Sequence, residues 1–336
     1  MSIKQMFKRT GGWLYLNSPL GRSQLRGAGV ILMLHRVLAD DRSAELPHRN
    51  ELCIGPHAFE QLLHWLKHHF DCVPLMELLQ ADAHPAPSAR PKVALTFDDG
   101  WRDNALNAFP LLLKHQVPAS IFLSTDFIGS HQRFWWESLG ETLWGIYGCA
   151  PRQRIIEHLE RIGRPLPPVF LLNGNEQQRS LALANYLDSL KSLSLQDLDT
   201  LTDNCPRESL PQALDWQQVR TLEKSGLIGF GPHGASHSIL TGLDDIHLDQ
   251  ELSRSHDALL QGCLHPLPVY CYPNGDHDQR VRQRLAAHRY TYALSTSAGI
   301  YRGSGDPLAL PRIGVSQRTA SRPSLLAWRI SKGGLA

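Results

Sequence analysis

The sequence lacks the features that mark secreted scaffolds, membrane-spanning chains and nucleic-acid-binding proteins. It contains no run of about eighteen apolar residues, so no transmembrane helix is expected. The formal net charge is only +2, which gives no broad basic surface, and we expect no nucleic-acid partner. The six cysteines include no C-x-x-C pair, so we expect neither a disulfide framework nor a cysteine-based zinc site. We expect all six to be reduced residues of the core: Cys53, Cys72, Cys149, Cys205, Cys263 and Cys271.

The N-terminal segment Met1–Arg26 also lacks the continuous apolar stretch and cleavage site of a signal peptide. Gly11 and Gly12 interrupt its apolar character. We therefore expect a cytoplasmic protein. The mixture of basic residues with apolar ones such as Trp13 and Leu14 allows peripheral contact with a membrane, but a short helix docked on the body of the protein is the favoured interpretation.

Short apolar runs alternate with amphipathic stretches over much of the 336-residue chain. A strand over Val93–Phe97, a helix over Ala105–His115 and a strand over Ala119–Ser124 form a βαβ unit, and Val30–Leu34 predicts an earlier buried strand. This alternation predicts an α/β protein with a parallel sheet, open or closed into a barrel. Later strands are expected at Leu227–Phe230, Val269–Tyr272, Thr291–Leu294 and Ala309–Val315.

The alternation stops between Ser130 and Leu214, where helices are expected instead. An earlier proline-containing stretch, Ala83–Pro91, predicts a loop. The helices are expected at Phe134–Trp136, Glu141–Tyr147, Arg152–Ile162 and Glu176–Leu190. We divide the chain into an N-terminal segment (1–29), a first barrel part (30–129), a helical insertion (130–214), a second barrel part (215–320) and a C-terminal tail (321–336).

Two adjacent carboxylates, Asp98 and Asp99, follow a predicted buried strand. Like charges at close range oppose the ionisation of both, and a bound cation is the simplest compensation. The carboxyl ends of parallel strands are also where α/β folds place their sites. A turn that merely uses Asp-Asp-Gly chemistry is an equally good interpretation of these residues alone.

A second element, Gly231–His237, follows another predicted strand and contains two histidines. The chain is rich in histidine, with 17 in all, so a lone pair is often coincidental. At a spacing of four residues, His233 and His237 would lie on one side of a helical turn and reach one ion. Two histidines and one carboxylate form an open three-ligand site that leaves a position for water and substrate.

Three strings now resemble a known family in their order along the chain. They are Leu95–Gly100 (LTFDDG), the His-x-x-x-His element that begins at His233, and Tyr272–Gly275 (YPNG). Together they resemble the first three motifs of the polysaccharide deacetylases, carbohydrate esterase family 4. The resemblance implies a distorted (β/α) barrel, here with a helical insertion, that removes acetyl groups from sugars with one divalent metal ion, zinc being the expected one.

The resemblance also implies roles for individual residues. Asp99, His233 and His237 would be the metal ligands, and Asp98 the general base that takes the proton of the attacking water. A backbone N–H near Asn274 would help to stabilise the tetrahedral oxyanion.

The chain departs from the family pattern in two places. Gly234 stands where the family usually has Ser or Thr, so one hydrogen bond is either lost or supplied by Ser236. Cys271 stands where an arginine commonly orients the base. Arg312 is the candidate substitute because its planar fork of donors suits a carboxylate, although a surface arginine is an equally good interpretation.

The general acid is a third departure, because the family's late Leu-x-x-His motif is absent after Val315. Some members place this histidine after an N-terminal strand, and His35 in Leu-Met-Leu-His resembles that arrangement. His277, between Asp276 and Asp278, is the rival candidate. The other histidines are expected at the surface or in the core.

The resemblance, together with these residues, implies a metal-dependent hydrolase that deacetylates an N-acetylated glycan or glycan precursor. Two alternatives stay open: a catalytically impaired carbohydrate-binding barrel, and an amide hydrolase of the same fold acting on a non-sugar substrate. Trp135 and Trp136 suit stacking on a sugar ring, but core packing of the insertion is the favoured use.

Overall fold

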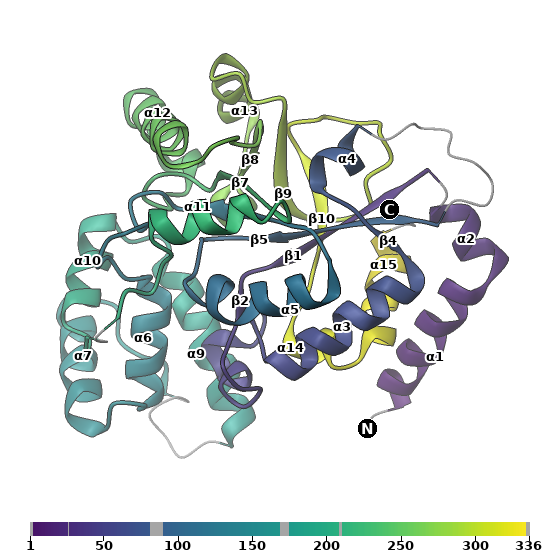
Figure 1. Ribbon diagram of the computed structural model, residues 1–336. Helices are drawn as coiled ribbons and strands as arrows, with labels where there is room; N and C mark the ends of the chain where they lie inside the picture. Colours follow the sequence, from purple (N-terminus) through teal and green to yellow (C-terminus); the bar gives the residue numbers. More distant parts are fainter. Residues whose placement is uncertain (1–2, 26, 81–89, 169–174, 208–209, 334–336) are drawn as a thin grey trace.

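Seven parallel strands form a nearly closed barrel at the centre of the molecule (Figure 1). Their order is β7-β6-β5-β1-β10-β9-β8, and the Leu267 N–H donates to the Phe230 carbonyl oxygen at 2.7 Å beside the β7 and β8 edges. The fold class predicted from the sequence is confirmed. The strands are β1 (Gly29–Leu34), β5 (Lys92–Phe97), β6 (Ala119–Leu123), β7 (Ile228–Pro232), β8 (Val269–Cys271), β9 (Tyr292–Ala298) and β10 (Leu310–Gly314).

The structure, a computed structural model, describes residues 3–25, 27–80, 90–168, 175–207 and 210–333. Most of the loop predicted over Ala83–Pro91 therefore lies outside the described residues. The barrel strands begin where their apolar runs begin, because side chains on both faces of β1 and β5 are buried. The short strand β4 (Asp71–Cys72) pairs with β5, and β2 (Arg36–Val37) pairs with β3 (Cys53–Ile54) in a separate two-stranded sheet.

Helices cover the outside of the barrel (Figure 1). Their apolar faces supply the other half of the core, as Phe59, Leu62 and Leu66 of α3 show. They are α3 (Pro56–His69), α4 (Leu75–Leu79), α5 (Phe109–His115) after a π-turn at Asn104–Ala108, α11 (Trp216–Lys224), α12 (Asp245–Gly262) and α13 (Gln279–Ala287).

Four helices of the middle of the chain gather beside the barrel, drawn in teal in Figure 1. They enclose a core of their own that includes Leu143, Leu159 and Leu187. The last helix was not predicted; its start is marked by Ser194, whose hydroxyl accepts a hydrogen bond from the Asp197 N–H. The helices are α6 (Trp135–Trp144), which joins two predicted helices into one, α7 (Cys149–Arg161), α9 (Glu176–Leu190) and α10 (Leu195–Asp203).

A buried ion-pair network ties this helical group to the barrel. Arg36 donates to Asp103 Oδ2 at 2.7 Å and to Glu137 Oε1 at 2.6 Å, and Arg49 donates to the same Glu137 oxygen from its Nε at 2.7 Å. Burial acts to raise the pKa of Glu137, but the two guanidinium groups lower it to about 2. The glutamate at the start of α6 is therefore a charged anchor to the loop after β1.

The N-terminal helices α1 (Ile3–Asn17) and α2 (Pro19–Leu25) lie at the end of the molecule that also holds α15 (Pro323–Gly333), after the short α14 (Gln317–Ala320) (Figure 1). The helices α1 and α15 approach closely at Gly12, where an added Cβ would lie 2.1 Å from the Ser324 carbonyl oxygen. Within the described part of the chain, no helix combines the length and apolar character needed to cross a bilayer.

The cysteines differ in part from the prediction. All six are free thiols, and four are buried. The expectation of core positions is wrong for Cys149, which is exposed because it begins the amphipathic helix α7 on its solvent side, and Cys72 is only half-buried.

Candidate active site

The carboxyl ends of the barrel strands bring the candidate residues to one rim. Asp98 and Asp99 follow β5, His35 follows β1, and His233 follows β7. Parallel pairing fixes this arrangement, since the Asp98 N–H donates to the Leu34 carbonyl oxygen at 3.0 Å. The residues that sequence reasoning proposed from distant motifs are therefore neighbours in space.

Asp99, His233 and His237 converge on one point. The Nε2 atoms of His233 and His237 lie 3.4 and 3.3 Å from Asp99 Oδ1. Trp101 holds the other carboxylate oxygen, because its Nε1–H donates to Asp99 Oδ2 at 2.7 Å. Burial acts to raise the pKa of Asp99, but the two imidazoles hold it well below its usual range.

This cluster fits a divalent cation. Asp99 Oδ1 is buried and has no hydrogen-bond partner among the described residues. The ligand atoms of Asp99, His233 and His237 all lie within 4.8 Å of one another. One carboxylate oxygen and two imidazole nitrogens form the donor set that zinc takes in open sites, so the residues present suit such an ion.

The histidine pair is not on a helical turn, which corrects the sequence interpretation. Residues 233–237 form a loop after β7, with left-handed φ values of 78° at Gly234 and 60° at His237. Asp99 (φ 74°) and Asn274 (φ 55°) share this conformation, which costs free energy in non-glycine residues and is often held in place at functional sites. Tertiary contacts, and not helical periodicity, aim the two imidazoles.

Glu251 of α12 holds this loop, and sequence reasoning missed it. Its carboxylate is buried and accepts hydrogen bonds from the N–H groups of Ala235 and Ser236 at 2.8 and 2.7 Å and from the Ser236 hydroxyl at 3.0 Å. A Cβ at Gly234 would lie 2.9 Å from the same carboxylate, which explains the glycine. The sequence signal that could have identified Glu251 is an acidic residue on the buried face of an amphipathic helix.

Ser236 does not replace a hydrogen bond to a histidine ligand in this structure, because its hydroxyl binds Glu251 and Ser238. The orientation of His233 comes instead from its Nδ1, which lies 2.9 Å from the Cys271 carbonyl oxygen. A backbone carbonyl on one ring nitrogen leaves the other nitrogen facing Asp99.

Arg312 of β10 contacts Asp98 through both terminal nitrogens of its guanidinium group. Its Nη1 and Nη2 lie 2.7 Å from Oδ1 and Oδ2, while its Nε donates to the Ser295 carbonyl oxygen at 2.9 Å. Burial acts to raise the pKa of Asp98, but Arg312 lowers it to about 2. Cys271 of β8 places its Sγ 3.4 Å from Asp98 Oδ1.

His35 is a further neighbour of Asp98. Its Nε2 is 4.0 Å from Asp98 Oδ2, and its buried Nδ1 has no hydrogen-bond partner within the described ranges. Burial lowers the pKa of His35, and the neighbouring carboxylates oppose that effect only in part. The rival, His277, is stacked on Tyr272 with its Nδ1 at 2.9 Å from the Gly275 carbonyl oxygen, and it does not line the cavity described next.

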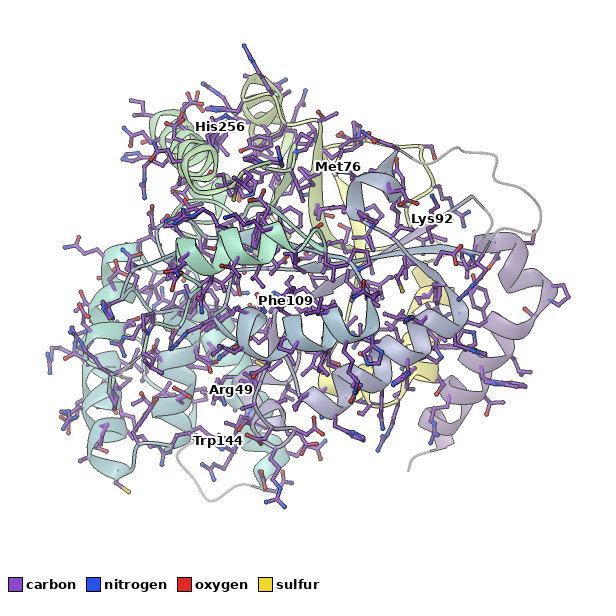
Figure 2. The ribbon with its side chains drawn as sticks, viewed as in Figure 1. Arg49, Met76, Lys92, Phe109, Trp144 and His256 are labelled. Atoms are coloured by element: carbon purple, nitrogen blue, oxygen red, sulfur yellow. The ribbon has the colours of Figure 1, made fainter. Side chains whose placement is uncertain are left out.

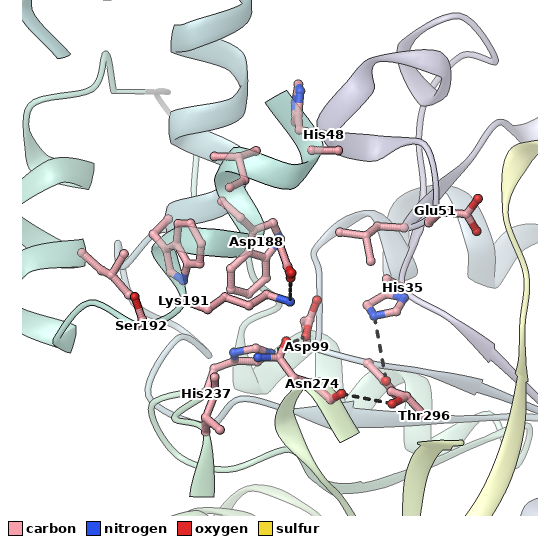
Figure 3. Close-up of a pocket in the computed structure, with 18 of the residues that line it drawn as sticks. His35, His48, Glu51, Asp99, Asp188, Lys191, Ser192, His237, Asn274 and Thr296 are labelled. Atoms are coloured by element: carbon pink, nitrogen blue, oxygen red, sulfur yellow. Dashed lines mark hydrogen bonds and ion pairs between the residues drawn. The ribbon is translucent and has the colours of Figure 1, made fainter. Parts of the chain in front are cut away.

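A cavity of about 1110 Å³ opens over these residues (Figure 3). His35, Asp99, His237 and Asn274 lie at one end of it. The Asn274 carbonyl oxygen accepts a hydrogen bond from the Thr296 hydroxyl at 3.1 Å, which ties its turn to β9.

Trp135 and Trp136, which the sequence analysis assigned to packing of the insertion, both line this cavity. The Trp136 ring also lies 4.8 Å from the ring of His237.

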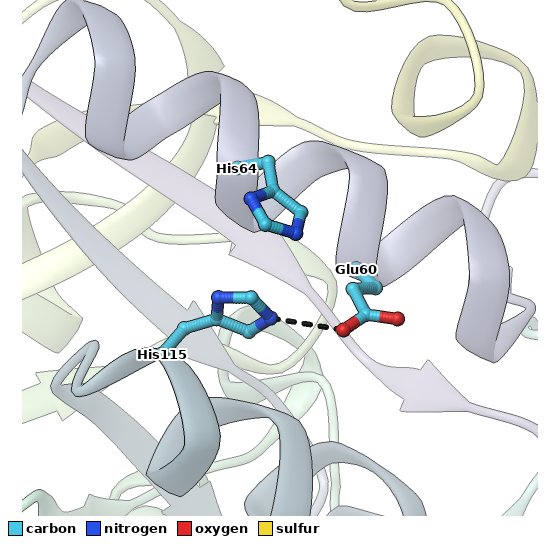
Figure 4. Close-up of side chains that lie close together, drawn as sticks. All are labelled: Glu60, His64 and His115. Carbon is cyan, nitrogen blue, oxygen red and sulfur yellow. Dashed lines mark hydrogen bonds and ion pairs between the residues drawn. The ribbon is translucent and has the colours of Figure 1, made fainter.

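Asp98, His233 and Cys271 form a group that overlaps the site, and a second histidine cluster lies away from this cavity (Figure 4). It joins Glu60 and His64 of α3 to His115 of α5. His115 Nε2 lies 3.0 Å from Glu60 Oε1, and the Lys114 ammonium donates to the same oxygen at 2.7 Å. Because a resident ammonium group already balances this carboxylate, we assign the cluster to packing between the two helices.

Comparison with known proteins agrees with this geometry. The family "Polysaccharide deacetylase" matches residues 86–293, more than half of the chain. The Bacillus subtilis protein YxkH, named after that family, is 30% identical over 118 residues, which are 34% of this chain and 40% of YxkH. The chain thus matches about two fifths of the length of that relative.

Solved structures share the fold. The Streptococcus pyogenes deacetylase PplD in complex with acetate has a TM-score of 0.58 at 18% identity, over 89% of this chain and 96% of PplD. IcaB from Ammonifex degensii has a TM-score of 0.55 at 17% identity, over 90% of this chain and 97% of IcaB. At these identities the likeness concerns the fold alone.

The barrel, with paired carboxylates and histidines at its carboxyl rim, defines a (β/α)-barrel protein with a candidate metal site at the usual end of the barrel. Within that class, the match over residues 86–293 is decisive. The chain belongs to the polysaccharide deacetylase family.

Proposed function

We propose that this chain is a metal-dependent deacetylase that hydrolyses the N-acetyl groups of a glycan or glycan precursor. The observation that carries the proposal is the placement of two carboxylates in different surroundings. Asp99 faces two histidines at 3.4 and 3.3 Å, whereas Asp98, although a His233 nitrogen lies within 4.8 Å of it, is held by both ends of the Arg312 guanidinium. A purely carbohydrate-binding barrel has no use for a second, separately oriented carboxylate beside a cation site.

Asp99, His233 and His237 would hold one divalent ion, with zinc the best match to the donor set. Such an ion, when bound, polarises the acetyl carbonyl and lowers the pKa of water. Asp98 remains ionised through the neutral range because Arg312 stabilises its charge, so it is available to accept a proton from the attacking water.

The remaining groups serve the leaving amine and the oxyanion. The water oxygen forms a bond to the acetyl carbon, the C–N bond breaks, and the products are acetate and a free amine. His35 is the proposed proton donor to that amine, since it lines the same cavity beside Asp98. A backbone N–H at the Asn274 turn is the proposed protein donor to the oxyanion.

The test measures acetate release from N-acetylhexosamine oligosaccharides by the protein as purified, after chelation and after zinc is restored. We expect release that chelation abolishes and zinc restores. Binding of the oligosaccharides without acetate release would support the impaired carbohydrate-binding barrel, and release only from non-sugar acetamides would support the amide hydrolase.

Peripheral membrane contact through α1 belongs to the same proposal. Trp13 is 60% exposed and Leu14 54% exposed on this helix. Apolar side chains of this kind can enter the headgroup region beside basic residues. Co-sedimentation with anionic vesicles should therefore be stronger for the natural chain than for Trp13→Ser.

A further inference from the structure

The cavity continues well beyond the candidate catalytic residues, along the helical group beside the barrel. Its volume of about 1110 Å³ exceeds the roughly 300–1000 Å³ of pockets that hold drug-sized ligands. An acetylated sugar ring would occupy only the end at Asp99 and His237. The far wall comes from α6, α9 and α10 and presents Trp135, Leu181, Ala184, Leu187, Leu195 and Leu198.

Several polar groups on that wall are paired within the protein. Lys191 and Asp188 form an ion pair at 2.8 Å. The Ser192 hydroxyl donates to the Ser189 carbonyl oxygen at 3.0 Å, and the Ser194 hydroxyl donates to Asp197 at 2.7 Å. Gln177 and Ser180 of α9 also line this wall, and its exposed aliphatic side chains have contacts left to make.

Two of the leucines on the wall are exposed, Leu181 at 63% and Leu195 at 44%. Single exposed leucines are ordinary, but exposed leucines that line one cavity together with a tryptophan form an apolar binding surface. A polysaccharide chain fits this wall poorly, because each sugar hydroxyl that loses water needs a hydrogen-bond partner in return.

We propose that the substrate is an N-acetylated sugar joined to a hydrocarbon chain, with the sugar at the Asp99 end and the chain along α9 and α10. The inference rests on the proposed deacetylase function and deepens it. A linear acyl or alkyl chain and a branched isoprenoid chain share this chemistry. The apolar wall and the candidate catalytic residues line one continuous cavity, so a sugar and the hydrocarbon chain attached to it can be held together.

The test compares kcat/KM for acetate release from the methyl, dodecyl and farnesyl glycosides of N-acetylglucosamine, each below its micellar concentration, and from N-acetylglucosamine oligosaccharides. Each methylene that enters the apolar section is worth about fourfold in affinity. We therefore expect at least about tenfold higher kcat/KM for a chain-bearing glycoside than for the methyl glycoside. A higher value for dodecyl indicates a linear chain, and a higher value for farnesyl an isoprenoid.

Two variants locate the effect. Leu181→Gln and Leu195→Gln should each lower the ratio of kcat/KM between the chain-bearing and methyl glycosides. The matched control is Leu260→Gln on α12, which is 58% exposed outside the cavity and should leave that ratio unchanged. An equal decrease of the kcat/KM ratio in all three variants would contradict the placement of the hydrocarbon chain along α9 and α10.

The outcomes separate this inference from the proposed function. Equal kcat/KM for all glycosides, or preference for the oligosaccharides, would overturn the hydrocarbon assignment and leave the deacetylase in place. Absence of acetate release from every acetylated sugar would overturn the proposed function itself.

Discussion

Arg312 and Asp98 form a bidentate ion pair although 214 positions separate them in the chain. The contact exists because β5 and β10 both pair with β1, one on each side. The buried side chain of Arg312 therefore reaches past β1 to β5, where its Nη1 also donates to Thr96 Oγ1 at 3.1 Å. The Cys271 thiol also lies 3.4 Å from Asp98 Oδ1, but it carries no positive charge, so Arg312 is the group that neutralises this buried carboxylate.

Replacing Arg312 should cost stability as well as activity. Breaking a buried ion pair by removing one partner typically costs about 3–5 kcal/mol. We expect Arg312→Gln to lower the free energy of unfolding in denaturant by an amount of that order, and Arg312→Lys to lose less because it keeps a charge. The control is Arg207→Gln, which breaks an exposed pair with Asp203 worth about 0–1 kcal/mol. Equal losses at both sites would contradict this account.

Asp98→Asn should abolish turnover and leave the metal bound. The amide keeps the shape of the side chain but cannot accept the proton of water, and loss of a general base costs about 10²–10⁴ in rate. Acetate release and metal content are measured together. Asp276→Asn, on the exposed loop after β8, is the control. Acetate release at the natural rate from Asp98→Asn would place the base elsewhere.

Replacing either His233 or His237 with alanine should remove the divalent ion. Each histidine would supply one of the three proposed protein ligands, so its loss would leave too few donors. The measurement is metal per chain by elemental analysis after gel filtration. His64→Ala, in the second histidine cluster, is the control and should keep full metal content. Unchanged stoichiometry in both His233→Ala and His237→Ala would rule out this ligand set.

His35→Ala should damage N-deacetylation far more than the hydrolysis of an aryl acetate. An aryl oxide leaves without a proton, whereas an amine leaving group needs one. The two rates are compared on the same preparation, with folding and metal content checked. The control variant is His68→Ala on the exposed face of α3. Equal losses on both substrates would indicate a structural role for His35.

Glu137 should make stability depend on pH. Its pKa is about 2 in the folded protein against an ordinary value of 4.5, so it stabilises the fold fully above pH 4.5, by on the order of 3 kcal/mol. That contribution is lost as the pH falls through 4.5 towards 2. The difference in unfolding free energy between the natural chain and Glu137→Gln should therefore be smaller at pH 3 than at pH 7. The control is Glu77→Gln, which breaks an exposed ion pair with Lys92. Its unfolding free energy should differ little from that of the natural chain at pH 3 and at pH 7.

Much of the fold was predictable from local sequence patterns. The buried strands at Val30–Leu34 and Val93–Phe97 agree with β1 and β5 to within one residue, because a parallel strand buried on both faces is a continuous apolar run. The helix α10 was missed, since its only clear signal was the Ser194 cap. The two helices predicted near Phe134 and Glu141 form the single helix α6, because the residues between them continue its buried face.

The sequence by itself determined which residues stand at the strand ends, and so brought Asp98, Asp99, His233 and His35 under consideration. Only the tertiary structure decided how they are held. The anchoring of the His233–His237 loop by Glu251 and the reach of Arg312 to Asp98 join side chains that are 15 or more positions apart. Periodicity reports which face of a local element is buried, whereas contacts of this kind depend on strand order and on the exact rotation of each strand, which no local pattern encodes.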